Sequence, residues 1–526
     1  MSGQTALWGG LTLEEKVGQM LVVGFHGLEP PDHILRWLAE GRIGGVILFA
    51  RNVRDPSQVA ELTRACREAA PRPILVAIDQ EGGVVTRLRE GFTESPGAMA
   101  LGAASSEELA EGVSMALGAE MRALGINWNL APALDLTHNT QNPSVGVRSL
   151  GVDPDQVSRL GVAQLRGFQR AGVAATAKHF PGKANTPIDP HVSLPVIEGP
   201  LNDMWDTDLV PFRAASEAGV AAMMVTHVQF KALESDHPST LSPSIIKGLL
   251  REDVGFKGLV STDCMEMKAV TNRYGPGESA VLAALAGANV ILFSHTLKYQ
   301  EAAYGALLDA ARTGRLPLEE VDFAVERIRE VKGRFAITGR PSLEAIRRPE
   351  HLEITARAAR SGTVMLRAGE GVLPLLRDGI RRVALIEFAS HLEKETLENG
   401  ARTHLASLLQ QELPNVEDLW LDAVSPTEGP LSGARALASS SDVVIVATRN
   451  AHLIPQQRGL AQELLVSGSR RVLLCLRNPY DAGVLKGAEA VICTCGDAMP
   501  SLVAAAQILA GRFKPTARLP VPLQMG

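Results

Sequence analysis

Eight short apolar runs recur along the first two thirds of the chain, and each closes on polar or glycine residues. They are MLVVGF (20–25), GVILFAR (45–51), ILVAIDQEGG (74–83), INWNLAPALDL (126–136), VAATAKHF (173–180), AAMMVTHV (221–228), GLVSTDC (258–264) and NVILFS (289–294). Such runs are typical of strands buried on both faces of a parallel sheet. Helix-like stretches, such as 55–69 and 106–125, separate them. Eight alternations of strand and helix predict a (β/α)8 barrel.

Polar residues stand at the ends of several of these runs. In a (β/α)8 barrel the active site lies at the C-terminal ends of the strands, so these residues are the first candidates for a functional site. They are Asp79, Asp135, Lys178, His179, His227 and Asp263.

The character of the sequence changes after residue 335. Residues 336–353 are polar and contain proline, which predicts a linker with a helix. New apolar runs follow at 383–389, 442–450, 471–479 and 490–496. They predict a smaller, doubly wound α/β sandwich domain. We therefore expect a catalytic barrel over 1–335, a linker over 336–355 and a C-terminal domain over 356–526. The second domain has no GxGxxG turn, so nothing supports nucleotide binding there.

Composition narrows the classes of partner. The chain has 526 residues and a formal net charge of −6, without a basic face, which argues against nucleic acid as the partner. No signal peptide is apparent and no apolar run approaches the roughly 20 residues that a spanning helix needs. Five scattered cysteines fit reduced thiols, so we expect a cytoplasmic protein without membrane contact. The spacing in CTC (493–495) does not suit a structural zinc.

Asp263 lies at the end of the seventh apolar run, in STDCMEM. An aspartate at a barrel strand's C-terminal end can serve as a nucleophile, a base or a metal ligand. Aspartate is also a good helix N-cap, and position alone does not decide between these roles.

Asp189 and His191 are two residues apart in KHFPGKANTPIDPH, a loop rich in turn-forming residues. In an extended loop this spacing points both side chains to one side. Asp189 can then accept a hydrogen bond from one imidazole nitrogen, which fixes the tautomer and makes the ring more basic. The alternative is a turn that Asp189 makes with Pro187 and Pro190, with His191 solvated.

Asp79 opens the segment DQEGGVVTRL, and Arg87 follows eight residues later. Gly82 and Gly83 allow the backbone to approach a ligand closely, and a buried aspartate can accept hydrogen bonds from sugar hydroxyls. A structural pair of Asp79 with Arg87 is the competing interpretation. Arg148, in NPSVGVRSLG, is likewise either a ligand clamp or a salt-bridge partner.

Lys178 supports a separate hypothesis. A desolvated lysine with a lowered pKa at a barrel strand end could form a Schiff base with a carbonyl substrate. Borohydride trapping would test this, since a missing adduct on Lys178 would exclude it.

Taken in order, these segments resemble glycoside hydrolase family 3, and more narrowly its bacterial β-N-acetylglucosaminidase branch. IDQEGGVVTRL, SPGAMALGA, NWNLAPALDL, RSLG, KHFPG, the Asp-x-His pair and STDCMEM follow one another as in that family. In the second domain, LRNPYD and the closing KPTARLPVPL resemble segments of two-domain members. The resemblance runs nearly from end to end.

The resemblance implies a role for each candidate residue. Asp263 would be the nucleophile that forms a glycosyl ester, His191 the general acid/base, and Asp189 the residue that orients His191. The non-reducing N-acetylglucosamine ring would be bound by Asp79, Arg87, Arg148, Lys178 and His179. The Asp-x-His pair matters most for the branch, because other branches draw a glutamate acid from elsewhere.

The chain departs from the family pattern on the acid/base loop. The family usually reads KHFPGHG, and this chain has Lys183 and Ala184 at the last two positions. Asn185 stands where an aspartate is common, and Pro190 stands where a serine is common. Because the loop length is preserved, we expect the register to be intact. The substitutions bear on loop mobility, leaving-group preference and rate.

These observations predict an exo-acting, retaining β-N-acetylglucosaminidase for small glycosides such as muropeptides, with no metal and no organic cofactor. Three alternatives remain open: a phosphorylase, a β-glucosidase of the same family, and a non-catalytic sugar-binding protein. The expected partner is a small carbohydrate, and the sequence does not predict an oligomeric state.

Overall fold

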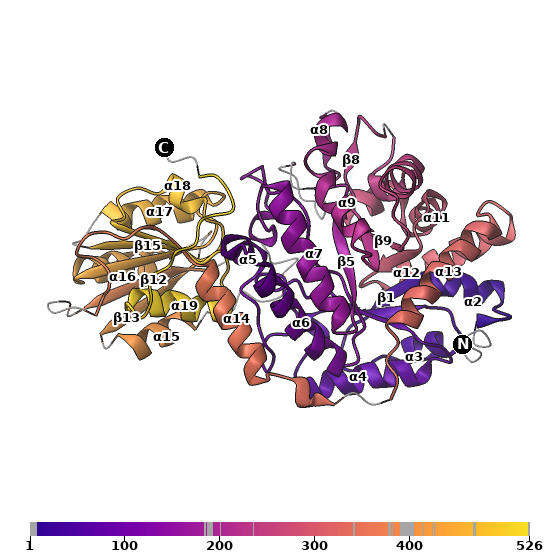
Figure 1. Ribbon diagram of the computed structural model, residues 1–526, viewed down its shortest axis with the longest axis horizontal. Helices are drawn as coiled ribbons and strands as arrows, with labels where there is room; N and C mark the ends of the chain where they lie inside the picture. Colours follow the sequence, from indigo (N-terminus) through magenta and orange to yellow (C-terminus); the bar gives the residue numbers. More distant parts are fainter. Residues whose placement is uncertain are drawn as a thin grey trace.

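The computed structural model describes residues 8–183, 186, 193–199, 201–234, 236–339, 342–376, 380, 382–389, 404–413, 415–422, 424, 427–466 and 470–523. These residues form two lobes of unequal size that lie side by side (Figure 1). The larger lobe holds the N-terminal part of the chain, and the smaller lobe holds the C-terminal part.

The larger lobe is a closed barrel of eight parallel strands in the order β1-β10-β9-β7-β5-β4-β3-β2. Its strands are β1 (Leu21–Gly24), β2 (Gly45–Leu48), β3 (Leu75–Ile78), β4 (Trp128–Asn129), β5 (Ala174–Phe180), β7 (Ala222–Val225), β9 (Leu259–Cys264) and β10 (Val290–Phe293). Each coincides with one of the eight apolar runs. The two short strands β6 (Val196–Ile197) and β8 (Gln229–Phe230) pair with each other outside the barrel.

Helices surround the barrel. They are α2 (Leu13–Gln19), α3 (Asp32–Ala39), α4 (Pro56–Ala69), α5 (Ala98–Ala104), α6 (Glu107–Ala123), α7 (Pro154–Arg170), α8 (Leu201–Trp205), α9 (Leu209–Glu217), the π-helical η4 (Ser244–Asp253), α10 (Lys268–Tyr274), α11 (Pro276–Ala286), α12 (Leu297–Arg312) and α13 (Leu318–Arg334), with short 3-10 turns η1 (Ala50–Asn52), η2 (Gly146–Arg148), η3 (Ser239–Leu241) and η5 (Leu343–Ala345). Side chains that cap the first turn fix where several of these helices begin. Asp55 and Ser106, for example, accept hydrogen bonds from backbone N–H groups in the first turns of α4 and α6.

The smaller lobe contains a six-stranded sheet in the order β11-β16-β15-β14-β12-β13. Its strands are β11 (Val364–Arg367), β12 (Val383–Phe388), β13 (Val416–Leu421), β14 (Val443–Thr448), β15 (Arg471–Cys475) and β16 (Ala490–Cys493). All pairs are parallel except that of β11 with β16, so the sheet is mixed. The predicted fold class, a barrel followed by a doubly wound α/β domain, is confirmed. Four of the six strands were predicted, and β11 and β13 were missed.

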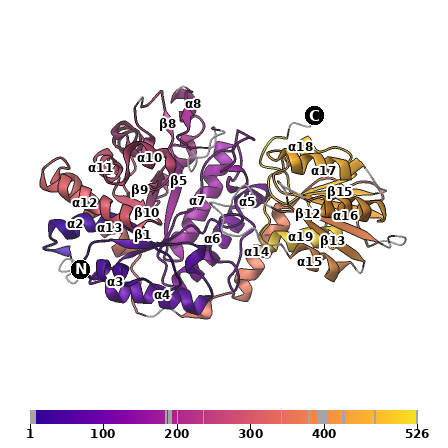
Figure 2. The ribbon, with the colours of Figure 1, turned by 180° about the vertical axis from the view of Figure 1, so that it is seen from behind.

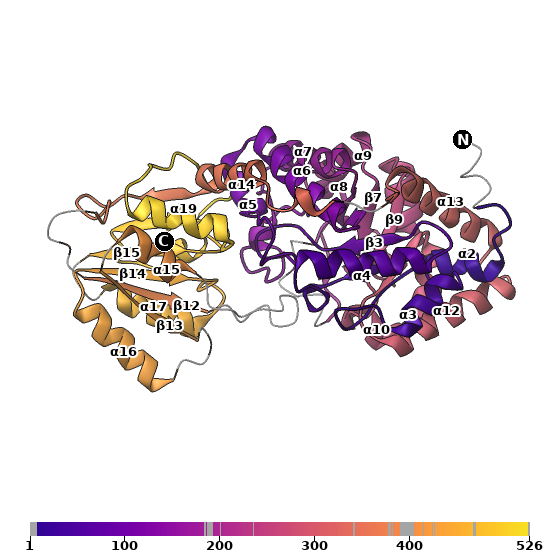
Figure 3. The ribbon, with the colours of Figure 1, turned by 90° about the horizontal axis from the view of Figure 1, so that it is seen from below.

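Helices cover both faces of this sheet. They are α15 (Leu405–Glu412), α16 (Glu428–Ser439), α17 (Pro455–Val466), α18 (Asp481–Val484) and α19 (Met499–Leu509). Because side chains alternate along a strand, Ile386 and Val446 pack in one apolar cluster with α16 and α17, while Leu385 and Ile445 pack in another with α15 and α19. Figure 3 shows α16 and α17 on the side of the sheet away from α19.

The two domains share an apolar cluster. Val85, Met99 of α5 and Val147 of η2 belong to the same cluster as residues of the second sheet. Helix α14 (Pro349–Gly362) packs against α5 and α6 of the barrel and against α19 of the second domain (Figure 2). The segments that carry several predicted site residues therefore lie directly against the second domain.

The structure contains no helix, among the residues it describes, that is long and apolar enough to cross a membrane. All five cysteines are free thiols. No group of three or more His, Cys, Asp or Glu side chains in the described part of the chain is placed to hold a metal ion.

Candidate active site

Strand β5 brings Lys178 and His179 to the C-terminal end of the barrel. Both side chains are buried, with 2% and 3% of their surface exposed. A buried lysine or histidine is unusual unless it is paired, so their partners define the surroundings of the site.

Lys178 is held by two carboxylates. Its Nζ donates to Asp79 Oδ1 at 2.7 Å and lies 2.7 Å from Glu81 Oε1. Burial alone would lower the pKa of Lys178, but the charges of Asp79 and Glu81 outweigh this effect and raise it. The amine therefore stays protonated, which disfavours the Schiff-base hypothesis because that chemistry needs a neutral amine.

Arg148 is bound to Glu81 by two hydrogen bonds. Nε donates to Oε2 at 2.9 Å and Nη2 donates to Oε1 at 2.7 Å. Burial alone would raise the pKa of Glu81, but the charges of Arg148 and Lys178 hold that pKa well below its usual range. Glu81 is thus an ionised link between the two cations. Arg148 is a salt-bridge partner here, which was one of its two predicted roles.

Glu81 was not singled out from the sequence, although a signal was present. It lies two residues after Asp79, and in an extended segment that spacing points both carboxylates to one side. The turn that follows uses Gly82 at φ +92° and Gly83 at φ +61°. A Cβ on Gly82 would lie 2.7 Å from Ser95, so these glycines admit the protein's own loop, not a ligand as the sequence suggested.

Arg87 lies at the edge of this cluster. Its Nη2 is 3.9 Å from Asp79 Oδ2, much farther than Lys178 is from the same carboxylate. Asp79 is therefore paired mainly with Lys178, and Arg87 supplies a second positive charge near it.

His179 is paired with Asp135, a strand-end residue that had no predicted role. Nδ1 lies 2.7 Å from Asp135 Oδ2, and Nε2 lies 3.4 Å from Arg148 Nη2. Burial lowers the pKa of His179 well below its ordinary value, and the charges of Lys183, Arg148 and Lys178 lower it further. The ring is therefore neutral, and this geometry assigns the proton to Nδ1, which donates to Asp135.

Lys183, one of the departures from the family pattern, is buried beside the same aspartate. Its backbone N–H donates to Asp135 Oδ1 at 2.9 Å. Burial raises the pKa of Asp135, and the charge of Lys183 opposes this rise. The lysine thus adds a cation next to Asp135 and His179.

Asp263 is the next-to-last residue of strand β9, and its Oδ1 accepts a hydrogen bond from the Cys264 N–H at 2.7 Å. The helix-cap alternative is wrong, because α10 begins at Lys268 with Met267 at its N-cap. His227, which is fully buried, donates from Nε2 to the Cys264 carbonyl at 2.9 Å and braces this strand end. Asp263 is close enough to His179 to raise the pKa of that ring, against the larger lowering by burial.

The structure therefore brings Asp79, Arg87, Arg148, Lys178, His179 and Asp263 to one end of the barrel. Asp189 and His191 lie outside the described residues, as do Ala184, Asn185 and Pro190. A cluster of this kind offers fixed donors and acceptors for a polar ligand, next to a carboxylate that can act as a nucleophile.

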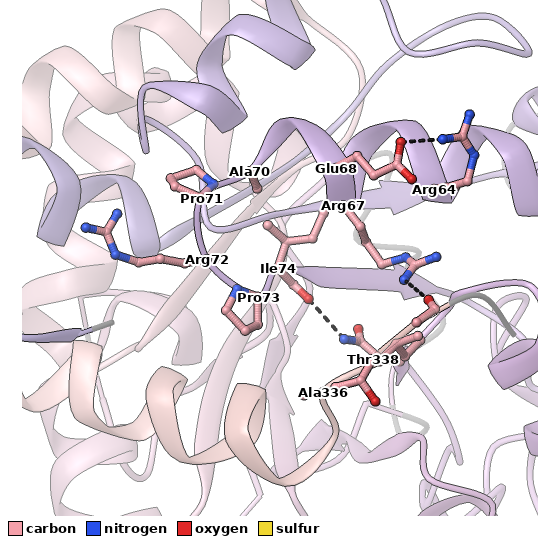
Figure 4. Close-up of a pocket in the computed structure, with 13 residues that line it drawn as sticks. Arg64, Arg67, Glu68, Ala70, Pro71, Arg72, Pro73, Ile74, Ala336 and Thr338 are labelled. Atoms are coloured by element: carbon pink, nitrogen blue, oxygen red, sulfur yellow. Dashed lines mark hydrogen bonds and ion pairs between the residues drawn. The ribbon is translucent and has the colours of Figure 1, made fainter. Parts of the chain in front are cut away.

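A cavity of 690 Å³ lies at the other end of the barrel (Figure 4). It is lined by Ile74 and Asn127, which precede β3 and β4, by Arg67 of α4, and by the linker from Ala336 to Gly339. Arg67 donates to the Gly339 carbonyl at 3.3 Å. Because barrel enzymes work at the C-terminal face, this cavity is not the candidate active site.

Comparison with known proteins identifies the family. The model of the glycosyl hydrolase family 3 N-terminal domain matches residues 12–331, which is more than half of the chain. The chain belongs to glycosyl hydrolase family 3. The resemblance predicted from the ordered motifs is therefore confirmed.

Individual relatives agree with this assignment. The structure of a glycoside hydrolase family 3 beta-N-acetylglucosaminidase from Paenibacillus sp. str. FPU-7 matches 98% of this chain and 100% of its own, with a TM-score of 0.91 and 37% identity. Beta-hexosaminidase A of Pseudoalteromonas piscicida is 29% identical over 497 residues, covering 86% of this chain and 82% of that protein. Beta-hexosaminidase of Thiobacillus denitrificans is 38% identical over 278 residues, covering 52% of this chain and 77% of that protein. The protein is a glycoside hydrolase.

Proposed function

We propose that this family 3 enzyme is an exo-acting, retaining β-N-acetylglucosaminidase that removes terminal N-acetylglucosamine from small glycosides such as muropeptides. The proposal rests on the position of Asp263 at the end of β9. There it lies beside the buried ion cluster, which consists of Asp79, Glu81, Arg148 and Lys178. The names of the similar proteins, a beta-N-acetylglucosaminidase and two beta-hexosaminidases, support the choice of sugar.

The ion cluster acts as the binding wall for the non-reducing sugar. Asp79 is only partly buried, and together with Lys178 and Arg148 it offers hydrogen-bond acceptors and donors in fixed positions. Arg87 and the neutral His179 complete the set. Charged groups that already hold one another in place bind hydroxyl groups without further ordering, so the anomeric carbon is held over Asp263.

The reaction has two displacement steps. In the first, a carboxylate oxygen of Asp263 attacks C1, and the bond between C1 and the leaving oxygen breaks as His191 gives that oxygen a proton. In the second, His191 takes a proton from water, the water oxygen attacks C1, and the ester bond to Asp263 breaks. Two inversions at C1 leave its configuration unchanged.

His191 takes the place of the carboxylic acid that most retaining glycosidases use. An unperturbed imidazole has a pKa of about 6.5, near neutrality, so it can give and take a proton in one cycle. Asp189, two residues earlier, accepts a hydrogen bond from the ring and orients it. The enzyme acts in the cytoplasm in this proposal, and its reaction needs no metal and no organic cofactor.

Paired aryl glycosides test the sugar. We expect p-nitrophenyl N-acetyl-β-glucosaminide to be cleaved far faster than p-nitrophenyl β-glucoside. The two substrates differ only at C2, where one has an acetamido group and the other a hydroxyl group, so the comparison tests the choice of sugar alone. The reverse preference would favour the β-glucosidase alternative, and no turnover of either would favour a sugar-binding protein. Release of sugar 1-phosphate in phosphate buffer, in place of free sugar, would favour the phosphorylase.

The acid/base role has its own test. His191→Ala should slow substrates with poor leaving groups much more than activated aryl glycosides, because only the former need a proton on the leaving oxygen. Asp189→Ala should give a smaller version of the same profile. Equal losses on both kinds of substrate would contradict the assignment of His191.

A further inference from the structure

A second cavity, of 640 Å³, lies between the two domains and shares none of the predicted site residues. Its walls come from the barrel segment 89–94, from α14, and from the second domain. Cavities of about 300–1,000 Å³ are typical of small-molecule sites, and domain interfaces are a common place for them.

The topology of the second sheet puts this cavity where such sheets bind ligands. Strand β12 pairs with β13 on one side and with β14 on the other, so the strand order reverses at β12. In open α/β sheets, ligands bind outside the carboxyl ends of the strands at this reversal. The cavity is lined by Ala389 just after β12, Trp420 near the end of β13, and Arg449 just after β14.

Two buried arginines form the floor on the side of the second domain. Arg449 and Arg477 both donate from Nε to Asp497 Oδ2, each at 2.8 Å. Burial alone would raise the pKa of Asp497, but the two arginines outweigh this and lower it. Arg477 belongs to the segment LRNPYD, whose role the proposed function leaves unexplained.

The barrel and α14 add further cations. Arg89, Arg347 and Arg360 also line the cavity, which gives five arginines against three carboxyl groups, those of Glu90, Glu94 and Asp497. Burial raises the pKa of Glu94, so this carboxyl group becomes neutral at a higher pH than an exposed glutamate does. Arginines therefore outnumber the carboxyl groups on the cavity surface itself, while Glu387 and Glu353, which do not line the cavity, pair with Arg449 at 2.8 Å and with Arg360 at 3.1 Å. Trp420, Leu502 and Phe92 supply the apolar surface of the cavity.

We propose that this interdomain cavity is a binding site for a small organic anion, whose phosphate or carboxylate group is held by the arginines and whose apolar part packs on Trp420. Arginine is suited to this because its planar fork of N–H donors matches carboxylate and phosphate oxygens. A ligand in this place contacts both domains. The site is independent of the proposed reaction, since it uses neither Asp263 nor the ion cluster.

Calorimetric titration of the full chain tests the site with four probes. Phenyl phosphate and phenylacetate carry an aromatic ring and an anion, benzyl alcohol carries the ring alone, and inorganic phosphate carries the anion alone. We expect saturable binding of one or both aromatic anions and much weaker binding of the last two probes. The stronger of the two aromatic anions identifies the anionic group that the cavity prefers.

Variants locate the binding. Arg89→Met and Trp420→Leu should each weaken the preferred aromatic anion by about tenfold or more, which is about 1.4 kcal/mol. Arg382→Met is the matched control, because Arg382 is a partly exposed arginine of the same domain at the opposite end of β12. It should bind as the wild type does, and so should Asp263→Asn. Arg89→Met should also keep the wild-type rate of glycoside hydrolysis.

Several results would overturn the proposal. They are no saturable binding of either aromatic anion at millimolar concentrations, benzyl alcohol binding as tightly as the anions, or equal affinities in wild type, Arg89→Met and Trp420→Leu. Weakening by Asp263→Asn alone would place the anion in the catalytic site. If one cavity variant fails to fold, the other variant and the probe series still decide the question.

Discussion

Glu81 lies between two buried cations, and the geometry of the candidate site depends on it. Its two oxygens hold Arg148, and one of them also lies beside Lys178. A buried ion pair adds little net stability, but removing one partner leaves an uncompensated charge in the interior. Glu81 therefore positions Arg148 and Lys178 and need not touch the substrate itself.

Glu81→Gln should be strongly destabilising and strongly inactivating. The amide cannot balance Lys178 and Arg148, and the cost of breaking such a buried pair is about 3–5 kcal/mol. Thermal unfolding and kcat/KM on an aryl N-acetylglucosaminide measure the two effects. Glu107→Gln, which removes an exposed carboxylate paired with Arg159, is the control and should change stability by less than about 1 kcal/mol. Similar stabilities for the two variants would contradict this view of the cluster.

Lys332 provides a pH-dependent prediction away from the site. It is buried, its Nζ donates to Gln19 Oε1 at 2.6 Å, and burial together with the charge of Arg72 lowers its pKa to about 7. Between pH 7 and about 10 the unfolded state carries a proton on this lysine that the folded state lacks. The Lys332 contribution to stability therefore rises with pH across that window and is least favourable below pH 7.

Lys332→Met should remove this dependence. The Tm of the variant relative to wild type should be highest near pH 6 and should fall as the pH is raised to 9, because only the wild type gains stability there. Thermal unfolding at several pH values measures the difference. Lys298→Met, at an exposed position on α12, is the control and should show a constant offset. A constant offset for Lys332→Met as well would contradict the lowered pKa.

Residue types and positions indicated most of the candidate site, but not its pairings. Asp79, Lys178, His179 and Asp263 stood out because the barrel pattern puts strand ends at the active face. Glu81 and Asp135 received no role, because their importance comes from Arg148 and His179, which are distant in sequence and meet them only in the folded chain.

At the scale of elements, continuous apolar runs identified all eight barrel strands, because each is buried on both faces. Strands β11 and β13 were missed, since both lie at the edges of the second sheet and carry exposed or polar residues. VEDLWL, for example, gives no continuous apolar signal. An edge strand is fixed by its neighbour more than by its own sequence.

The turn η2 shows how an element links the second domain to the site. Gly146 has φ +43°, and a Cβ there would lie 2.6 Å from Asn478 Oδ1. Asn478 is itself held, because its Nδ2 donates to Asn450 Oδ1 at 2.7 Å. Arg148 ends the same turn. The second domain thus packs against the turn that carries Arg148.

Gly146→Ala should displace this turn and lower activity. The left-handed backbone costs an alanine about 1–2 kcal/mol at either of two sites, Gly146 or Gly219. Gly219, at φ +72°, has no other atom within 4 Å of an added Cβ, so Gly219→Ala is the matched control. We expect both variants to lose some stability but only Gly146→Ala to lose a large part of kcat/KM. Equal kcat/KM in the two variants would contradict a role for the domain contact.

At the scale of the whole molecule, the two domains share an apolar cluster that includes Val85 and Val147, next to the residues of the candidate site. The sequence predicted two domains of these classes but not their contact. That contact depends on complementary surfaces of segments far apart in the chain, which no local pattern records. The second domain therefore packs against the segments that carry residues of the candidate site. We propose that it also helps to bind a small organic anion in the interdomain cavity.

The central claim for the molecule is that Asp263 forms a covalent bond to C1 of an N-acetylglucosamine unit. The most direct test is to trap this ester with a slow fluorinated aminosugar analogue, digest the protein and find the labelled peptide by mass spectrometry. We expect one sugar on the peptide that contains Asp263 and none in Asp263→Asn. A sugar bound to any other residue, or full turnover of an aryl N-acetylglucosaminide by Asp263→Asn, would contradict it.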